Sequence, residues 1–283
     1  MVPLQTEAHA FLVIGQKGID MLHSIKTLKG GSLSAKDGII GEVIDVYFDD
    51  SLWTIRYLVV ETGEWLASRK VLISPISINR GYSSIEKLIS VNLTRDQVRN
   101  SPSYDSQKPV SRQYEEKYAK YYDWPHYWAY PGIWGYGIYP HELSQARKET
   151  VGEFVAEKQN QDPHLRSANT VAGYTIDTRD GRMGNVEDFL FEDETWTVRY
   201  LIIDTVNWWP SKKVLIAPVW ASRIDWADRS LHLDLSKETI KSSPEYEPAK
   251  VLTRDYETSL YKHYGKSRYW DRIDAFKKTH KAA

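Results

Sequence analysis

Two sets of closely spaced carboxylates recur along this chain: Asp45 with Asp49-Asp50, and Asp188 with Glu192-Asp193. Paired carboxylates can act as general acid and base or hold a cation. No histidine or lysine nucleophile accompanies either set. We therefore favour a structural interpretation, in which the Asp45 carboxyl caps or pairs locally and the acids that follow form a solvated turn.

Two arginines stand near acids in a similar way, Arg56 near Glu61 and Arg199 near Asp204. A guanidinium binds carboxylate or phosphate through two parallel donors, so either arginine could anchor an anionic partner. We favour an intramolecular ion pair instead, which Asp45 or Asp188 could share.

The chain shows no histidine, cysteine or glycine spacing typical of a metal, thiolate or phosphate site. The eight histidines include no H-x-H or H-x-x-x-H pair, so we expect no metal site. The chain has no cysteine, which excludes disulfides and thiolate chemistry and favours the reducing cytoplasm. No Gly-rich phosphate loop occurs. We therefore expect no cofactor, no catalytic residues and no enzymatic activity.

Large aromatic residues are the candidates for partner binding. Trp65, Trp208 and Trp209 precede short strand-like segments that begin at Lys70 and Lys213. Aromatic side chains beside loops can anchor a partner protein. They can also close the end of a β-structure or pack one half of the chain on the other, and both interpretations stay open.

The segment 114–139 holds 11 of the 36 aromatic residues of the chain. Such residues stack on sugars or bases, or become buried in a protein interface. Little basic charge is interleaved and the formal net charge is −1, which argues against nucleic acid. Packing between the two halves of the chain and exposure to a partner both remain open for the four residues without a repeat counterpart: Tyr130, Trp134, Tyr136 and Tyr139.

These residues belong to a chain that contains one sequence twice. Residues 37–75 return as residues 180–218 at a constant shift of 143, and 20 of the 39 positions are identical. Further downstream the shift is 142. A repeat of this length is a whole folding unit, so the shared residues are expected to determine the fold. This repeat signature includes Gly41, Trp53, Arg56 and Pro75 in the first copy, and Gly184, Trp196, Arg199 and Pro218 in the second.

The repeat predicts five segments: an N-terminal extension (1–20), a first unit (21–128), an aromatic linker containing Gly and Pro (129–163), a second unit (164–270) and a C-terminal tail (271–283). The longest apolar run near the start is too short for a signal peptide or a membrane span. We therefore expect a cytoplasmic protein.

Each unit is predicted to be mainly β. Branched and aromatic residues predict strands at 43–48 and 53–60, with an acidic hairpin turn between them, and Pro75 ends a further strand at 71–74. Thr94 and Gln97 form a capping box at the start of a short helix, and a second helix is expected over about 111–121.

The strand 53–60 has two distinct sides. The side that carries Tyr57 and Val59 is apolar throughout, so we expect it to face the interior. The other side becomes apolar at Leu58 and Val60, and we expect helices or the other unit to cover it.

The ordered motif D-G-x-x-G-x-V-x-D, an acidic turn, W-T-[IV]-R-Y-L-[VI]-[VI]-[ED]-T and K-V-L-I-x-P resembles the PRC-barrel domain. This domain is the cytoplasmic barrel of the photosynthetic reaction-centre H subunit and the C-terminal half of the ribosome maturation factor. The resemblance implies a small β-barrel in each unit and a scaffold that docks onto larger assemblies. The chain lacks the membrane helix of the former and the separate N-terminal domain of the latter.

Together these observations predict a mainly β fold of two small PRC-type barrels in tandem, each followed by short C-terminal helices. We expect a non-catalytic scaffold that docks onto a larger protein complex. A role like that of the reaction-centre H subunit is one example that the resemblance implies. Two alternatives are an RNA- or ribosome-maturation-linked factor and a small-ligand or sugar-binding protein. The partner protein is unknown, and a homodimer stays open.

Overall fold

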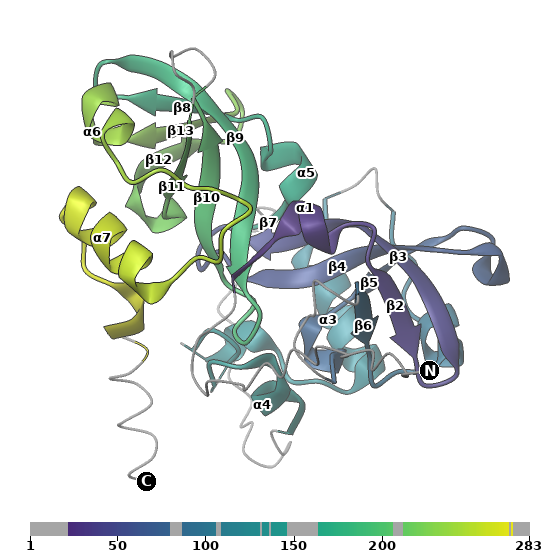
Figure 1. Cartoon of the computed structure of the whole chain (residues 1–283). Helices are drawn as coiled ribbons and strands as arrows, with labels where there is room; N and C mark the ends of the chain where they lie inside the picture. Colours follow the sequence, from purple (N-terminus) through teal and green to yellow (C-terminus); the bar gives the residue numbers. More distant parts are fainter. Residues whose placement is uncertain are drawn as a thin grey trace, which may run out of the picture.

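The computed structural model describes residues 22–79, 87–105, 109–130, 132–135, 137–145, 164–205, 212–271 and 273. In this part of the chain, 13 strands form two mixed sheets with short helices around them (Figure 1). The prediction of a mainly β protein is confirmed.

The first unit contains six strands and several short helices in its described residues: β1 (Leu22–Ser24), α1 (Ile25–Leu28), β2 (Ser32–Ala35), β3 (Gly38–Asp49), β4 (Ile55–Thr62), η1 (Glu64–Leu66), β5 (Lys70–Ile73), η2 (Pro75–Ser77), β6 (Leu88–Ser90), α2 (Arg95–Arg99), α3 (Arg112–Tyr122) and η3 (Tyr127–Ala129). The linker adds α4 (Pro140–Gln145). The strands at β3, β4 and β5 and the helices at α2 and α3 lie where the sequence predicts them.

The second unit repeats this order: β7 (Leu165–Ser167), α5 (Ala168–Val171), β8 (Thr175–Thr178), β9 (Gly181–Glu192), β10 (Val198–Asp204), β11 (Lys213–Ile216), η5 (Pro218–Trp220), β12 (Ala221–Asp225), β13 (Ser230–Leu233), α6 (Lys237–Lys241) and α7 (Arg254–Tyr264). The strand orders are β5-β4-β3-β2-β6 in one sheet and β11-β10-β9-β8-β13-β12 in the other. Within the described residues, no ladder closes either sheet into a barrel.

The repeated glycines permit a close approach between the two long strands of each unit. A Cβ atom at Gly41 would lie 2.0 Å from the carbonyl oxygen of Glu61, and one at Gly184 would lie 2.3 Å from that of Asp204. Gly184 also has a φ of +157°. Since any side chain would force the hairpins apart, glycine is required at both positions.

A bulge in β4 reverses the predicted assignment of its two sides. Tyr47 pairs with Tyr57, but Phe48 pairs with Ile55, so Arg56 is an extra residue in the strand. Because one extra residue shifts the side-chain alternation, Leu58 and Val60 enter the main core. Tyr57 and Val59 instead pack against Tyr118 of α3 in a second cluster. The predicted interior side is therefore correct for Trp53 and Ile55, which lie in the main core, and wrong beyond the bulge, for Tyr57 and Val59.

The two units exchange their first strands. β1 of the first unit pairs with β9 of the second, and β7 of the second pairs with β3 of the first. The registers are equivalent, since Leu22 pairs with Glu192 and Leu165 pairs with Asp49. In Figure 1, α1 and α5, which follow the exchanged strands, lie next to each other where the units meet. The units are thus joined within one chain by reciprocal pairing.

The hairpin tips of the two units also touch at the centre of this junction. The Ile55 N–H donates to the Trp196 carbonyl and the Val198 N–H donates to the Trp53 carbonyl, both at 2.7 Å. Trp53 and Trp196 have φ values of +54° and +58°. The repeated tryptophans therefore place their backbone carbonyls across the junction, and their rings stack on Phe48 and Phe191.

The predicted capping box at α2 is present, with the Gln97 N–H donating to Thr94 Oγ1 and the Thr94 N–H donating to Gln97 Oε1. Thr94→Ala is expected to lower the free energy of unfolding by about 1 kcal/mol, because an orphan helix N–H loses its acceptor. Thr94→Ser keeps the hydroxyl and should stay within a few tenths of the parent. Urea denaturation measures both, and equal losses for the two variants would contradict the capping role.

In the described part of the chain, no helix combines the length and apolar character needed to cross a membrane.

Candidate functional site

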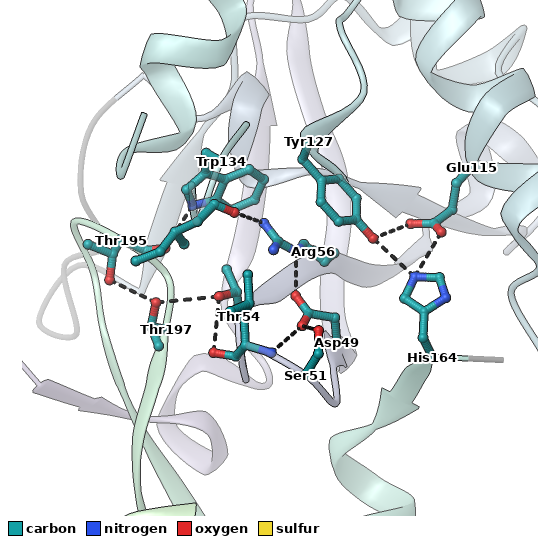
Figure 2. Close-up of polar contacts among 12 residues, drawn as sticks. Asp49, Ser51, Thr54, Arg56, Glu115, Tyr127, Trp134, His164, Thr195 and Thr197 are labelled. Carbon is teal, nitrogen blue, oxygen red and sulfur yellow. Dashed lines mark hydrogen bonds and ion pairs between the residues drawn. The ribbon is translucent and has the colours of Figure 1, made fainter. Parts of the chain in front are cut away.

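The repeated arginine of the first unit lies at the centre of the junction, on the β4 bulge. Its side chain is only 1% exposed, and its Nε donates to Asp49 Oδ2 at 2.7 Å. Asp49 also accepts from the Ser51 hydroxyl at 2.9 Å. Figure 2 shows this ion pair beneath the rings of Tyr127 and Trp134. The predicted intramolecular ion pair of Arg56 therefore exists, but its partner is Asp49 rather than Glu61 or Asp45, and Asp49 is buried rather than part of a solvated turn.

Trp134 covers this guanidinium. Its ring lies 4.6 Å from the Arg56 carbon Cζ, and its Nε1–H donates to the Thr195 carbonyl of the second unit at 2.8 Å. The Arg56 Nη1 donates to the Ile133 carbonyl at 2.7 Å. Trp134 is 0% exposed. Of the two interpretations left open for Trp134, the structure shows packing between the units.

A second buried acid, Glu115, lies on α3 beside the same ring system. It accepts from the Tyr127 hydroxyl at 2.7 Å and from Arg112 at 3.0 Å, and it lies 3.0 Å from His164 Nε2 (Figure 2). Its counterpart Glu257 contacts Tyr200, Tyr269 and Arg254. Burial raises the pKa of Glu257. Neither acid is among the residues predicted from the sequence, although the repeated Tyr-Glu pairs at 114–115 and 256–257 could have indicated them.

The second arginine repeats the first with one difference. Arg199 also lies on a bulge, pairs with Glu192 and has its Cζ 4.2 Å from the Tyr269 ring. The predicted intramolecular ion pair again forms, with Glu192 in place of Asp204. Where Trp134 covers Arg56, however, Arg199 lines an open groove. The two copies therefore differ in what covers the guanidinium.

This groove has a volume of about 460 Å³ and lies between the units. The second unit supplies Arg199, Tyr261, Tyr269 and Val219, the hairpin tip of the first unit supplies Leu52, and the linker turn that carries Trp134 supplies Gly132, Ile133 and Ile138. Two of these apolar side chains are exposed, Val219 to 62% and Leu52 to 44%. We call this the Arg199 groove. Its chemistry suits binding of an aromatic or apolar group beside a guanidinium.

The carboxyls of Asp45 and Asp188 hold the exchanged segments. Asp45 accepts from the Ser167 hydroxyl and from the Asn169 N–H at 3.1 Å, and Asp188 accepts from the Ser24 hydroxyl and the Lys26 N–H at 3.1 Å. The expected local contact of Asp45 exists, since its Oδ1 accepts from the Val46 N–H at 2.8 Å, but the same carboxyl also binds Ser167 and Asn169, which lie more than 120 residues away along the chain.

Burial raises the pKa of the Asp45 and Asp188 carboxyls above the usual value of 3.8, against the opposing effect of these hydrogen bonds. The folded chain therefore takes up protons at a higher pH than the unfolded chain. This contribution to the free energy of unfolding falls as pH rises from the usual carboxyl pKa through the raised one. The double variant Asp45→Asn/Asp188→Asn is expected to lack this fall in urea titrations at a series of pH values. Parallel pH profiles for parent and variant would contradict it.

The remaining aromatic candidates have different settings. Trp65 is half-buried, donates from Nε1 to the Ile40 carbonyl at 2.7 Å and lies over Arg95. Tyr139 is half-buried and stacks on His141. Trp208, Trp209 and Tyr136 fall outside the described residues. Of the aromatic candidates in the described residues (Trp65, Tyr130, Trp134 and Tyr139), none lines the Arg199 groove. The groove itself was not predicted from the sequence.

Pro75 and Pro218 begin the 3-10 turns η2 and η5 directly after β5 and β11, as strand-ending residues should. Pro218 lines the Arg199 groove beside Val219. Among the described residues, no group of three or more His, Asp or Glu side chains could hold a metal ion. The described site therefore offers an ion pair, aromatic rings and an apolar surface.

No family model matches the chain. Over 79 residues the chain is 35% identical to an uncharacterized protein of Deinococcus radiodurans. The match covers 28% of this chain and 28% of that relative, so the chain spans well under a third of the relative that it matches. The name of that protein states no activity.

Proposed function

We propose that this protein is a non-enzymatic interaction scaffold of PRC-barrel type, which docks onto a larger protein complex through the Arg199 groove. One observation carries the proposal. The two repeated arginines differ in their surroundings: Trp134 lies over Arg56, whereas among the described residues no tryptophan lies over Arg199, which lines a groove. Exposed Val219 and Leu52 give this groove an apolar surface that a partner would bury.

The charged groups at the junction support binding rather than catalysis. Asp49 and Glu192 each pair with an arginine on the same hairpin, and Glu115 has three polar partners. A buried ion pair with satisfied hydrogen bonds is a structural element, whereas a general base needs access to a substrate proton. The proposed scaffold therefore uses these pairs to hold its two units in fixed positions.

Site-specific photocrosslinking tests the proposal. A photoreactive amino acid at position 219 is expected to capture a partner in the native host, and the same amino acid at the 86%-exposed position 251 should not. The captured protein is then purified and its binding reconstituted with the intact chain. Val219→Glu should abolish that binding while the circular dichroism and unfolding profile stay unchanged. Identical capture at positions 219 and 251 would contradict docking through the groove.

The groove volume favours a second candidate, a small aromatic ligand. A volume of about 460 Å³ falls within the range of small-molecule sites, and Tyr261, Tyr269 and Arg199 supply stacking and donor groups. A thermal-shift screen of aromatic acids and sugars tests this candidate. A ligand that stabilises the parent but not Val219→Glu would support it.

A further inference from the structure

The first unit contains a complete example of how its repeated arginine is covered. The indole of Trp134 lies over the Arg56 guanidinium, and the carbonyl of the preceding residue, Ile133, accepts from Arg56 Nη1. The indole N–H reaches the Thr195 carbonyl at the hairpin tip of the other unit. One segment of the linker thus supplies both contacts of the Arg56 guanidinium: the Trp134 ring and the Ile133 carbonyl.

The Arg199 groove has the matching groups in place. At the repeat shifts, Arg199 corresponds to Arg56, Tyr269 to Tyr127, and Leu52 to Thr195. Arg199 donates to Glu192 through Nε and Nη2. Within the described residues, its Nη1 donates to no acceptor, whereas the Nη1 of Arg56 binds the Ile133 carbonyl. A guanidinium N–H thus remains for a backbone carbonyl of an occupant.

The turn that presents Trp134 depends on glycines. A Cβ atom at Gly132 would lie 2.3 Å from the Gly135 carbonyl oxygen and 2.7 Å from the Gly137 carbonyl oxygen. Gly135 has a φ of +71°, which strains other residues. Any segment that repeats this geometry therefore needs the glycines.

The sequence that follows the second unit does not supply such a turn. At the shift of 142, Phe276 aligns with Trp134, but Asp274 and Lys277 occupy the positions of Gly132 and Gly135. A segment with side chains at these positions cannot form the same close-packed turn. Residues 274–283 therefore lack the glycines of this turn, and we consider a second polypeptide as the occupant.

We propose that the Arg199 groove binds a tryptophan presented on a Gly-x-Trp-Gly turn of a partner protein, in the way that the linker presents Trp134 to Arg56. This inference rests on the proposed docking function and names the chemistry of the partner. The indole stacks on the Arg199 guanidinium beside Tyr269. The preceding carbonyl accepts from Arg199 Nη1, and the indole N–H donates to the Leu52 carbonyl. Val219 packs against the aliphatic side of the turn.

The linker of this chain is itself the probe. A fluorescent peptide of residues 130–143, blocked at both ends, is expected to bind the intact chain in a polarisation titration. Replacing its tryptophan by alanine (Trp134→Ala in the peptide) should weaken binding at least about tenfold, because a buried indole dominates such contacts. Equal affinity of the two peptides, or no binding of either, would overturn the proposal.

Two protein variants locate the binding site. Val219→Glu places a charge in the groove and should weaken peptide binding at least about tenfold, because the carboxylate must be desolvated. The matched control Val251→Glu changes an 86%-exposed valine outside the groove and should bind as the parent does. If Val219→Glu binds equally well, the peptide has displaced the linker from Arg56, and the proposal is wrong.

A variant that ends at residue 273 tests the alternative that residues 274–283 themselves occupy the groove. We expect it to bind the peptide as the intact chain does. Binding only after this truncation would show that residues 274–283 occupy the groove and would overturn the proposal. Photocrosslinking at position 219 is independent of the peptide, so a reconstituted partner without a Trp-bearing turn would leave the docking function standing and remove only the inference about tryptophan.

Discussion

Replacing Arg56 with methionine is expected to lower the free energy of unfolding by about 3–5 kcal/mol, the usual loss when one partner of a buried ion pair is removed. Asp49 would keep its hydrogen bonds from Ser51 and the Leu52 N–H, but its charge would remain buried without a cation. Trp134 would lose the guanidinium beneath its ring. The loss combines an unpaired charge with a loosened contact between the units.

Urea denaturation of the intact chain measures this effect. The control Arg99→Met removes an ion pair with Asp96 whose two side chains are at least half exposed, and it should be close to neutral. The double variant Arg56→Met/Asp49→Leu should recover part of the loss, since no charge is left buried. A loss below about 1 kcal/mol for Arg56→Met would mean that water reaches Asp49 and that the pair does not hold the junction.

Local features of the fold could be predicted from the sequence because each depends on neighbouring residues. The Thr94 capping box, the strand end at Pro75 and the hairpin between β3 and β4 follow from patterns only a few residues long. The repeat also marked Gly41 and Gly184 as fold-determining residues, and the close hairpin approach explains them.

Long-range pairing could not be predicted in this way. Nothing near Asp45 in the sequence indicates that its carboxylate accepts hydrogen bonds from Ser167 and Asn169. The one-residue bulge at Arg56 likewise reversed the sides of β4, because strict alternation contains no signal for an inserted residue. The Arg199 groove was missed for a related reason. It results from a difference in packing between two copies whose arginines are identical.

Separating the two units is expected to abolish folding of each. A fragment of residues 1–145 would expose the edge of β3 that β7 covers, and Asp45 would lose the groups that it binds. A fragment of residues 146–283 would expose the matching edge of β9, which β1 covers. An uncovered edge beside buried apolar side chains promotes aggregation. We therefore expect each fragment to be insoluble when expressed alone.

Co-expression should restore both fragments as one complex, because the exchanged strands can pair between chains as they do within one. Size-exclusion chromatography and circular dichroism of the co-purified fragments measure this recovery. Leu165→Asp, on the buried side of β7, should prevent the complex, whereas Val251→Asp at an exposed position should not. A fragment of residues 1–145 that is soluble, monomeric and cooperatively folded by itself would contradict the argument. In that case each unit would fold without the strand it receives from the other. The exchanged strands would then not fix the Arg199 groove between the units.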